Sequence, residues 1–100
     1  MLFRSPTNDS TPLMLAAELG NIEAVNCLLD KGADPFIRDQ LGRNLLHAAS
    51  KGGNVAIITK MLSLGLNVNS KDVMDRTPFN IAEQFGKIEA VNFLLSKGGH

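Results

Sequence analysis

The sequence has no tryptophan and no tyrosine, and it contains one cysteine, Cys27. A single cysteine rules out a disulfide within the chain, which is typical of proteins from a reducing compartment. The chain also has no net charge, because ten lysines and arginines balance ten aspartates and glutamates. Proteins that bind nucleic acid or anionic membranes through charge usually carry a basic excess, so this balance argues against both classes.

Long apolar runs are missing as well. No stretch approaches the roughly 20 apolar residues that span a bilayer, and the first residues, MLFRSPTNDS, lack the apolar core of a secretory signal. Hydrophobic residues still make up 44% of the chain, an ordinary share for a folded domain. We therefore expect one small domain over residues 1–100, in the cytoplasm or the nucleus, with no membrane segment.

One pattern recurs three times, as TPLMLAAELGN, NLLHAASKGGN and TPFNIAEQFGK. The copies begin 33 residues apart, at Thr11, Asn44 and Thr77. Each of these residues has a side-chain oxygen that can cap the N-terminus of a helix. Each copy also has a glycine nine residues later, where a helix can end. The pattern therefore predicts a short helix of about two turns in every copy.

A second apolar segment follows each of these helices, as NIEAVNCLLDKG, NVAIITKMLSLG and KIEAVNFLLSKG. In the first segment the apolar residues Ile22, Val25, Leu28 and Leu29 form one stripe of an amphipathic helix. The stretches between units, ADPFIRDQLGR and LNVNSKDVMDR, are rich in turn residues and predict hairpin-like loops.

Each unit is thus predicted to be helix, turn, helix and loop, over about residues 9–41, 42–74 and 75–100. Two short helices cannot bury their apolar faces alone, whereas three stacked units can share a continuous core. The predicted fold is therefore an all-α solenoid of three helix-turn-helix units.

These motifs resemble the ankyrin repeat, a 33-residue unit with a TPLH-AA--G helix and an LL--GAD ending. TPLMLAAELG and LLDKGAD match it closely, and the resemblance covers residues 9 to 99. It implies that His47 ties neighbouring loops together by hydrogen bonds. Met14 and Asn80 stand where the family usually has this histidine, so we expect weaker ties in units one and three.

Another column departs from the family pattern. Asp9 and Asp75 stand where Gly42 keeps the loop glycine of the family, which takes a positive φ. Asn69 resembles the loop asparagine that an asparaginyl hydroxylase modifies. The preferred alternative is a turn asparagine that bonds its own loop.

Few residues suggest chemistry. Cys27 or Ser50 could serve as a nucleophile beside His47. We instead interpret His47 as a structural histidine and Cys27 as a partly buried, small apolar residue. The segment KGGN lacks the spacing of a phosphate-binding loop. Cysteine and histidine do not cluster as metal ligands do. We expect no enzyme activity, no cofactor and no metal.

The resemblance implies that another protein binds the loop tips and the concave face of the first helices. The residues outside the framework columns there are Leu19, Gln40, Leu41, Arg43, Lys51, Val73, Met74, Arg76, Gln84 and Phe85. Without tryptophan or tyrosine, Phe85 and Met74 are the expected anchors. Alternatively, Leu41 and Met74 pack within their loops. Phe36 is either an anchor or, preferably, a loop-packing residue.

The functional hypothesis is a non-catalytic protein-interaction module. The alternative is a structural scaffold piece or an engineered repeat protein without a dedicated partner. Glu83 stands in the column of Ala17 and Ser50, which indicates that unit three is terminal. Either Leu2 and Phe3 fold over the first unit as a cap or, preferably, the chain is excised from a longer array. We expect a monomer, with self-association through an uncapped end as the hazard.

Overall fold

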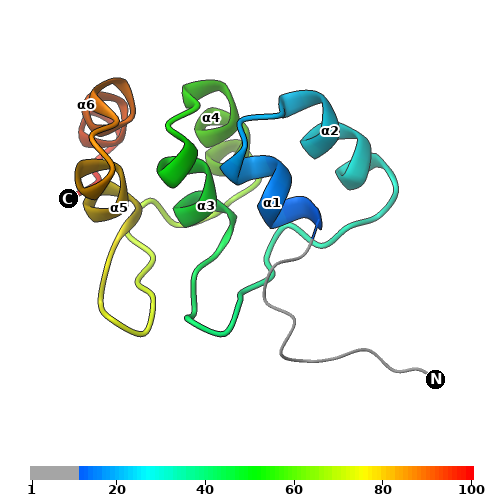
Figure 1. The fold of residues 1–100 in the computed structure, drawn as a ribbon, viewed down its shortest axis with the longest axis horizontal. Coiled ribbons are helices and arrows are strands. Elements are labelled where there is room, and N and C mark those ends of the chain that lie inside the picture. The colour runs from blue at the N-terminus through cyan, green and yellow to red at the C-terminus, as the bar shows by residue number, and fades with distance from the viewer. Residues whose placement is uncertain (1–11) are drawn as a thin grey trace.

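The computed structural model describes residues 12–100, which form three helical pairs that stand side by side in chain order (Figure 1). The helices are α1 (Pro12–Glu18), α2 (Ile22–Asp30), α3 (Leu45–Gly52), α4 (Val55–Ser63), α5 (Pro78–Gln84) and α6 (Ile88–Ser96). The stack measures 43 × 29 × 21 Å. This architecture confirms the predicted all-α solenoid.

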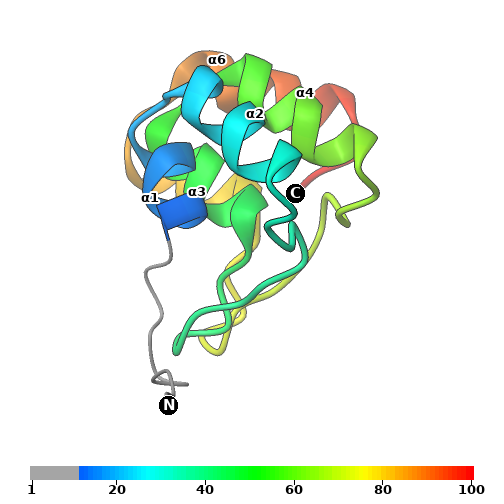
Figure 2. The same cartoon turned by 90° about the vertical axis from the view of Figure 1, so that its right-hand side faces the viewer.

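The helices form two layers, as Figures 1 and 2 show together. The first helices, α1, α3 and α5, make one layer, and α2, α4 and α6 make the other. The two loops that connect the units extend to one side of the first-helix layer. None of the six described helices is long and apolar enough to cross a membrane.

Capping residues set where the helices begin. The side chain of Asn44 accepts the N–H of His47 at 3.1 Å, and Thr77 accepts that of Asn80 at 3.2 Å. α3 ends at Gly53, whose φ of 74° is the left-handed conformation that glycine adopts without strain. These caps confirm the predicted starts of α3 and α5, whereas Thr11 lies outside the described residues.

The core runs between the two layers and is most complete in the middle unit. Leu45, Leu46, Ile57, Ile58 and Met61 are all fully buried. This unit has a neighbour on both sides, so both of its faces are covered. The burial pattern therefore follows from stacking, as the repeat predicted.

One expectation about burial is wrong. Cys27 is exposed, although it was interpreted as a partly buried apolar residue. α2 buries Val25 completely and half-buries Leu28 and Leu29. Cys27 lies outside this stripe on the helix surface, and its small side chain does not reach the core.

Candidate protein-interaction surface

The loop after unit one is a tight turn organised by Asp39. One carboxylate oxygen of Asp39 accepts the backbone N–H groups of Leu41 and Arg43, both at 2.9 Å. The other oxygen binds Nε and Nη2 of Arg43 at 2.7 and 2.6 Å. The N–H of Gly42 donates to the carbonyl of Asp39 at 3.0 Å, which closes the turn. The loop is therefore held in place from within.

The loop after unit two repeats this turn 33 residues later. Asp72 accepts the N–H groups of Met74 and Arg76 at 2.8 and 2.9 Å, and it binds Nε of Arg76 at 2.9 Å. Asp75 has a φ of 61°, and Gly42 in the same column has a φ of 74°. The expected left-handed conformation is therefore confirmed at Gly42 and Asp75, whereas Asp9 of the same column lies outside the described residues.

The buried carboxylate of Asp72 stays charged. Burial alone would raise the pKa of Asp72, but the backbone N–H groups of Arg76 and Met74 and the Arg76 guanidinium outweigh it. The pKa therefore lies below its usual value. The ionised form is the one that accepts these hydrogen bonds, so the turn is stable at neutral pH.

The two loops are also joined to each other by hydrogen bonds. The N–H of Val73 donates to the carbonyl of Leu41 at 2.8 Å, and Nη1 of Arg38 donates to the carbonyl of Lys71 at 3.2 Å. These bonds fix one loop against the next. A partner that binds both loops would meet a surface that is already ordered.

Apolar side chains stand at the tips of these ordered loops. Leu41 is 42% exposed, Val73 63% and Met74 68%. The alternative that Leu41 and Met74 pack within their loops is therefore wrong, because both side chains are exposed. Gln40, beside Leu41, is exposed as well.

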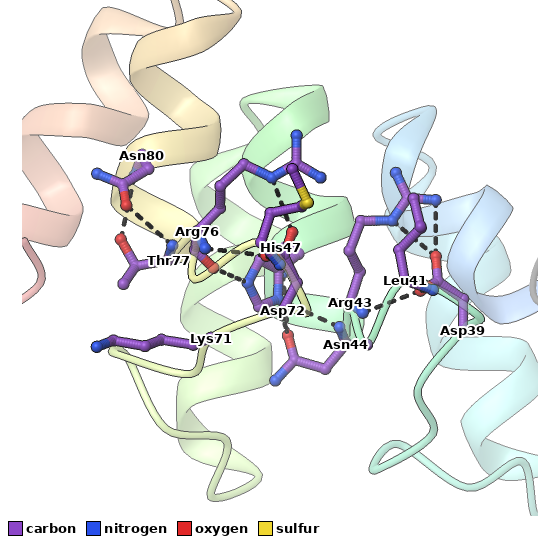
Figure 3. A network of polar contacts seen from close by, with 12 residues as sticks. Asp39, Leu41, Arg43, Asn44, His47, Lys71, Asp72, Arg76, Thr77 and Asn80 are labelled. Carbon is purple, nitrogen blue, oxygen red and sulfur yellow. Dashed lines mark hydrogen bonds and ion pairs between the residues drawn. The ribbon is translucent and has the colours of Figure 1, made fainter.

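His47 ties the second loop to the middle unit (Figure 3). Its Nδ1 accepts the N–H of Asn44 at 3.2 Å, and its Nε2 donates to the carbonyl of Arg76 at 2.7 Å. This is the tie between neighbouring loops that the resemblance implies. In unit three, the side-chain oxygen of Asn80 accepts the N–H of Thr77 at 3.1 Å, a bond confined to the start of α5.

A hollow of about 50 Å³ lies between the loops and the first helices. Its lining consists of Met14, Glu18, Arg43, His47, Ala48, Lys51, Arg76, Ile81 and Phe85. Nζ of Lys51 lies 3.5 Å from a carboxylate oxygen of Glu18 and 5.4 Å from the centre of the Phe85 ring. Lys51 thus bridges units one and three across the hollow.

Eight of the ten candidate residues lie either around the hollow or at the loop tips, and two lie at neither place. Arg43, Lys51, Arg76 and Phe85 line the hollow, whereas Gln40, Leu41, Val73 and Met74 lie at the loop tips. Leu19 and Gln84 are exposed near the ends of α1 and α5 and do not line the hollow.

The sequence reasoning missed three apolar residues of the hollow, Met14, Ala48 and Ile81. A signal for them exists, because the 33-residue period places Ala48 and Ile81 in one column and Met14 in that of His47. Met14 was considered only as the counterpart of His47, and Ala48 and Ile81 were not singled out. They are largely buried, so they form the floor of the hollow.

Phe36 and Asn69 share a column but differ in role. Asn69 donates from Nδ2 to the carbonyl of Gly98 at 3.2 Å and accepts the N–H of His100 at 3.1 Å. Its side chain therefore bonds the end of unit three and not its own loop, so the preferred interpretation as a turn asparagine that bonds its own loop is wrong. Phe36 is 58% exposed beside a hollow of about 200 Å³, so the preferred loop-packing interpretation is wrong.

The geometry around His47 does not suit a catalytic base. Both ring nitrogens are engaged by the backbone, at Asn44 and Arg76. Burial lowers the pKa of His47, although the hydrogen bond to Arg76 and the charge of Asp72 act in the opposite direction. Within residues 12–100, no three His, Cys, Asp or Glu side chains lie close enough together to hold a metal ion.

Ser50 supplies a stability prediction. It is fully buried in α3, and its hydroxyl has no hydrogen-bond partner among the described residues. Ser50→Ala is therefore expected to raise the free energy of unfolding by about 1 kcal/mol, measured by urea denaturation. Ser63→Ala is the control, because that exposed hydroxyl donates to Lys60 and its loss should change little. A destabilised Ser50→Ala protein would contradict the prediction.

Stacked helical pairs with ordered loops on one side define a helical repeat protein. Residues 13–100 match the profile of ankyrin repeats in three copies, so the chain belongs to the ankyrin-repeat family. Regulatory protein SWI6 of Saccharomyces cerevisiae is 52% identical over 42 residues. That match covers 42% of this chain and 5% of SWI6, so it spans a small part of that relative. Ankyrin repeats generally serve as protein-interaction modules.

Proposed function

We propose that this chain is a non-catalytic interaction module whose partner contacts the loop tips and the concave face. The observation that carries the proposal is the exposure of Leu41, Val73 and Met74 on loops that their own hydrogen bonds hold in place. Because the backbone of these loops is already ordered, little conformational entropy of the loops is lost when a partner binds the apolar side chains. The family's general role in protein contacts supports this proposal.

The proposed partner surface combines the apolar loop tips with two arginines, Arg43 and Arg76, that form ion pairs within their own loops. Arg43 and Arg76 are half-buried, with Asp39 and Asp72 behind them. Because these charges are balanced locally, long-range attraction contributes little to binding. We expect the affinity to depend weakly on salt. A tenfold loss between low and moderate salt would contradict this apolar mode of contact.

In this proposal the repeats occupy about residues 9–41, 42–74 and 75–100, and the tips fall at the first two boundaries. The module acts inside the cell, in the cytoplasm or the nucleus, and binds its partner as a monomer. The yeast relative is named a regulatory protein, which agrees with such a role.

The test is affinity capture from cells of the source with two matched variants. Val73→Ser/Met74→Ser removes the apolar tips, and Ile88→Ser/Leu95→Ser removes two exposed apolar residues from α6. Arg76 is kept, because its loss would leave the buried carboxylate of Asp72 without its cation. Circular dichroism confirms that both variants fold.

We expect the tip variant to bind the partner at least tenfold more weakly than the wild type, which corresponds to a loss of about 1.4 kcal/mol in binding free energy. The α6 variant should retain it. Equal capture by both variants and the wild type would exclude the loop tips as the binding surface.

A further inference from the structure

Units one and three contain nearly the same second helix, and its two copies differ in burial. Both read IEAVN followed by LL, at residues 22–29 and 88–95. Val25 is completely buried, whereas Val91 in the same column is only half-buried. Identical residues differ here because unit one has a following unit and unit three has none in the described structure. The comparison thus shows which side chains a following unit covers.

By this criterion the C-terminal face of the stack is an uncovered contact surface. Ile22 and Leu29 are half-buried in unit one, whereas Ile88 is 67% and Leu95 is 56% exposed in unit three. We call Ile88, Val91 and Leu95 the end face. These are the same residue types through which unit one meets unit two. A unit of the same kind therefore fits this face.

The opposite end of the stack shows the complementary pattern. Leu28 is half-buried in unit one, whereas Leu94 in the same column of unit three, which has a preceding unit, is completely buried. An open hollow of about 220 Å³ lies at this end. Its lining is almost entirely apolar and consists of Pro12, Leu13, Leu28, Ala33, Asp34 and Ile37. This surface can receive apolar side chains such as those of the end face.

A polar contact between units can be repeated as well. Nδ2 of Asn54 donates to the carbonyl of Gly20 at 3.2 Å, across the boundary between units one and two. Asn21 and Gly86 are the same residue types in the same columns. Asn21 also caps α2 as Asn54 caps α4, accepting an N–H at 3.1 Å. A second copy's Asn21 could therefore donate to the carbonyl of Gly86.

One residue opposes this contact. Glu83 stands in the column of Ala17 and Ser50, both of which are completely buried by the following unit. Glu83 is exposed, and burying its charge without a partner would be unfavourable. The end face therefore combines an apolar surface with one carboxylate that weakens docking.

We propose that the end face docks the N-terminal repeat of a second copy of this chain, head to tail, and that Glu83 keeps this association weak. Such a contact uses two different surfaces, so it does not close into a symmetric dimer but continues to higher oligomers. It is separate from the loop tips of the proposed partner surface.

Sedimentation velocity over a range of concentrations tests the proposal. Glu83→Ala restores the small residue of the inner units and should raise the association constant at least tenfold, with species beyond the dimer. Ile88→Ser/Leu95→Ser should abolish association, both alone and combined with Glu83→Ala. Glu89→Ala is the matched control, because this carboxylate and Glu23 in the same column are exposed in both units.

Three results would overturn the proposal. The first is a Glu83→Ala protein that stays monomeric at every concentration. The second is an oligomer that stops at the dimer, which would indicate a symmetric contact. The third is an equal increase for Glu89→Ala, which would indicate a general effect of charge. Partner capture by the loop tips is unaffected by any of these results.

Discussion

Replacing Gly52 with alanine is expected to lower the free energy of unfolding by about 2 kcal/mol, although alanine is the better helix former. Gly52 is the last residue of α3 and lies against the backbone at the end of α1. A Cβ at this position would overlap the carbonyl oxygen of Glu18 and lie 3.1 Å from that of Ala17. Both neighbours are backbone atoms, so the two helices would have to separate.

Urea denaturation of the variant beside Lys51→Ala tests this expectation. Lys51 precedes Gly52 in α3, and its ion pair with Glu18 lies near the surface, so its loss should change stability by about 0.5 kcal/mol or less. A Gly52→Ala protein as stable as the wild type would show that α1 and α3 tolerate a side chain between them.

The second large effect is a loss of stability as the pH falls below 6.5. Burial lowers the pKa of His47 below its value of 6.5 in an unfolded chain, despite the hydrogen bond to Arg76 and the charge of Asp72. Between the folded and unfolded pKa values the unfolded chain binds the extra proton, so acid favours unfolding. The slope is at most about 1.4 kcal/mol per pH unit. Above pH 6.5 the ring is neutral in both states and contributes no pH dependence.

His47→Asn separates this titration from other acid effects. Asparagine can accept the backbone N–H of the N-cap Asn44 as Asn80 accepts that of Thr77 in α5, but it cannot reach the carbonyl of Arg76. We expect a loss of about 2 kcal/mol at pH 8 and a smaller further loss at pH 5.5 than in the wild type. Equal pH dependence in urea denaturation of the two proteins would contradict the assignment.

Asp72 acts in a separate and more acidic range. Its pKa lies below 3.8 in the folded protein, because the N–H groups and the guanidinium that it binds outweigh the effect of burial. Its stabilising contribution is therefore complete above pH 3.8 and is lost as the pH falls through the lower, folded value. The two groups together predict two successive losses of stability on acidification.

The sequence predicted the fold because its signals are local. Capping residues such as Asn44 and Thr77 begin helices through contacts three residues away, and the 33-residue period reports directly on stacking. The left-handed conformation at Asp75 was also predicted, from the glycine column of the repeat. Local rules of this kind do not need the rest of the structure.

The candidate surface was harder to predict, because burial depends on neighbours distant in the sequence. Arg43 and Arg76 were chosen as exposed contact residues, but both are half-buried clamps for Asp39 and Asp72. The shared spacing of aspartate and arginine in DQLGR and DVMDR was a signal for this pair. The exposure of Phe36 had no comparable signal.

The central claim is that a partner protein contacts the loop tips, and site-specific photo-crosslinking tests it most directly. A photo-reactive residue would replace Met74 at the tip or, as the control, Ile88 on α6; both positions are exposed to a similar extent. The proposal predicts a crosslinked partner from position 74 and none of that partner from position 88. Crosslinking of the same partner from position 88 and not from position 74 would contradict it.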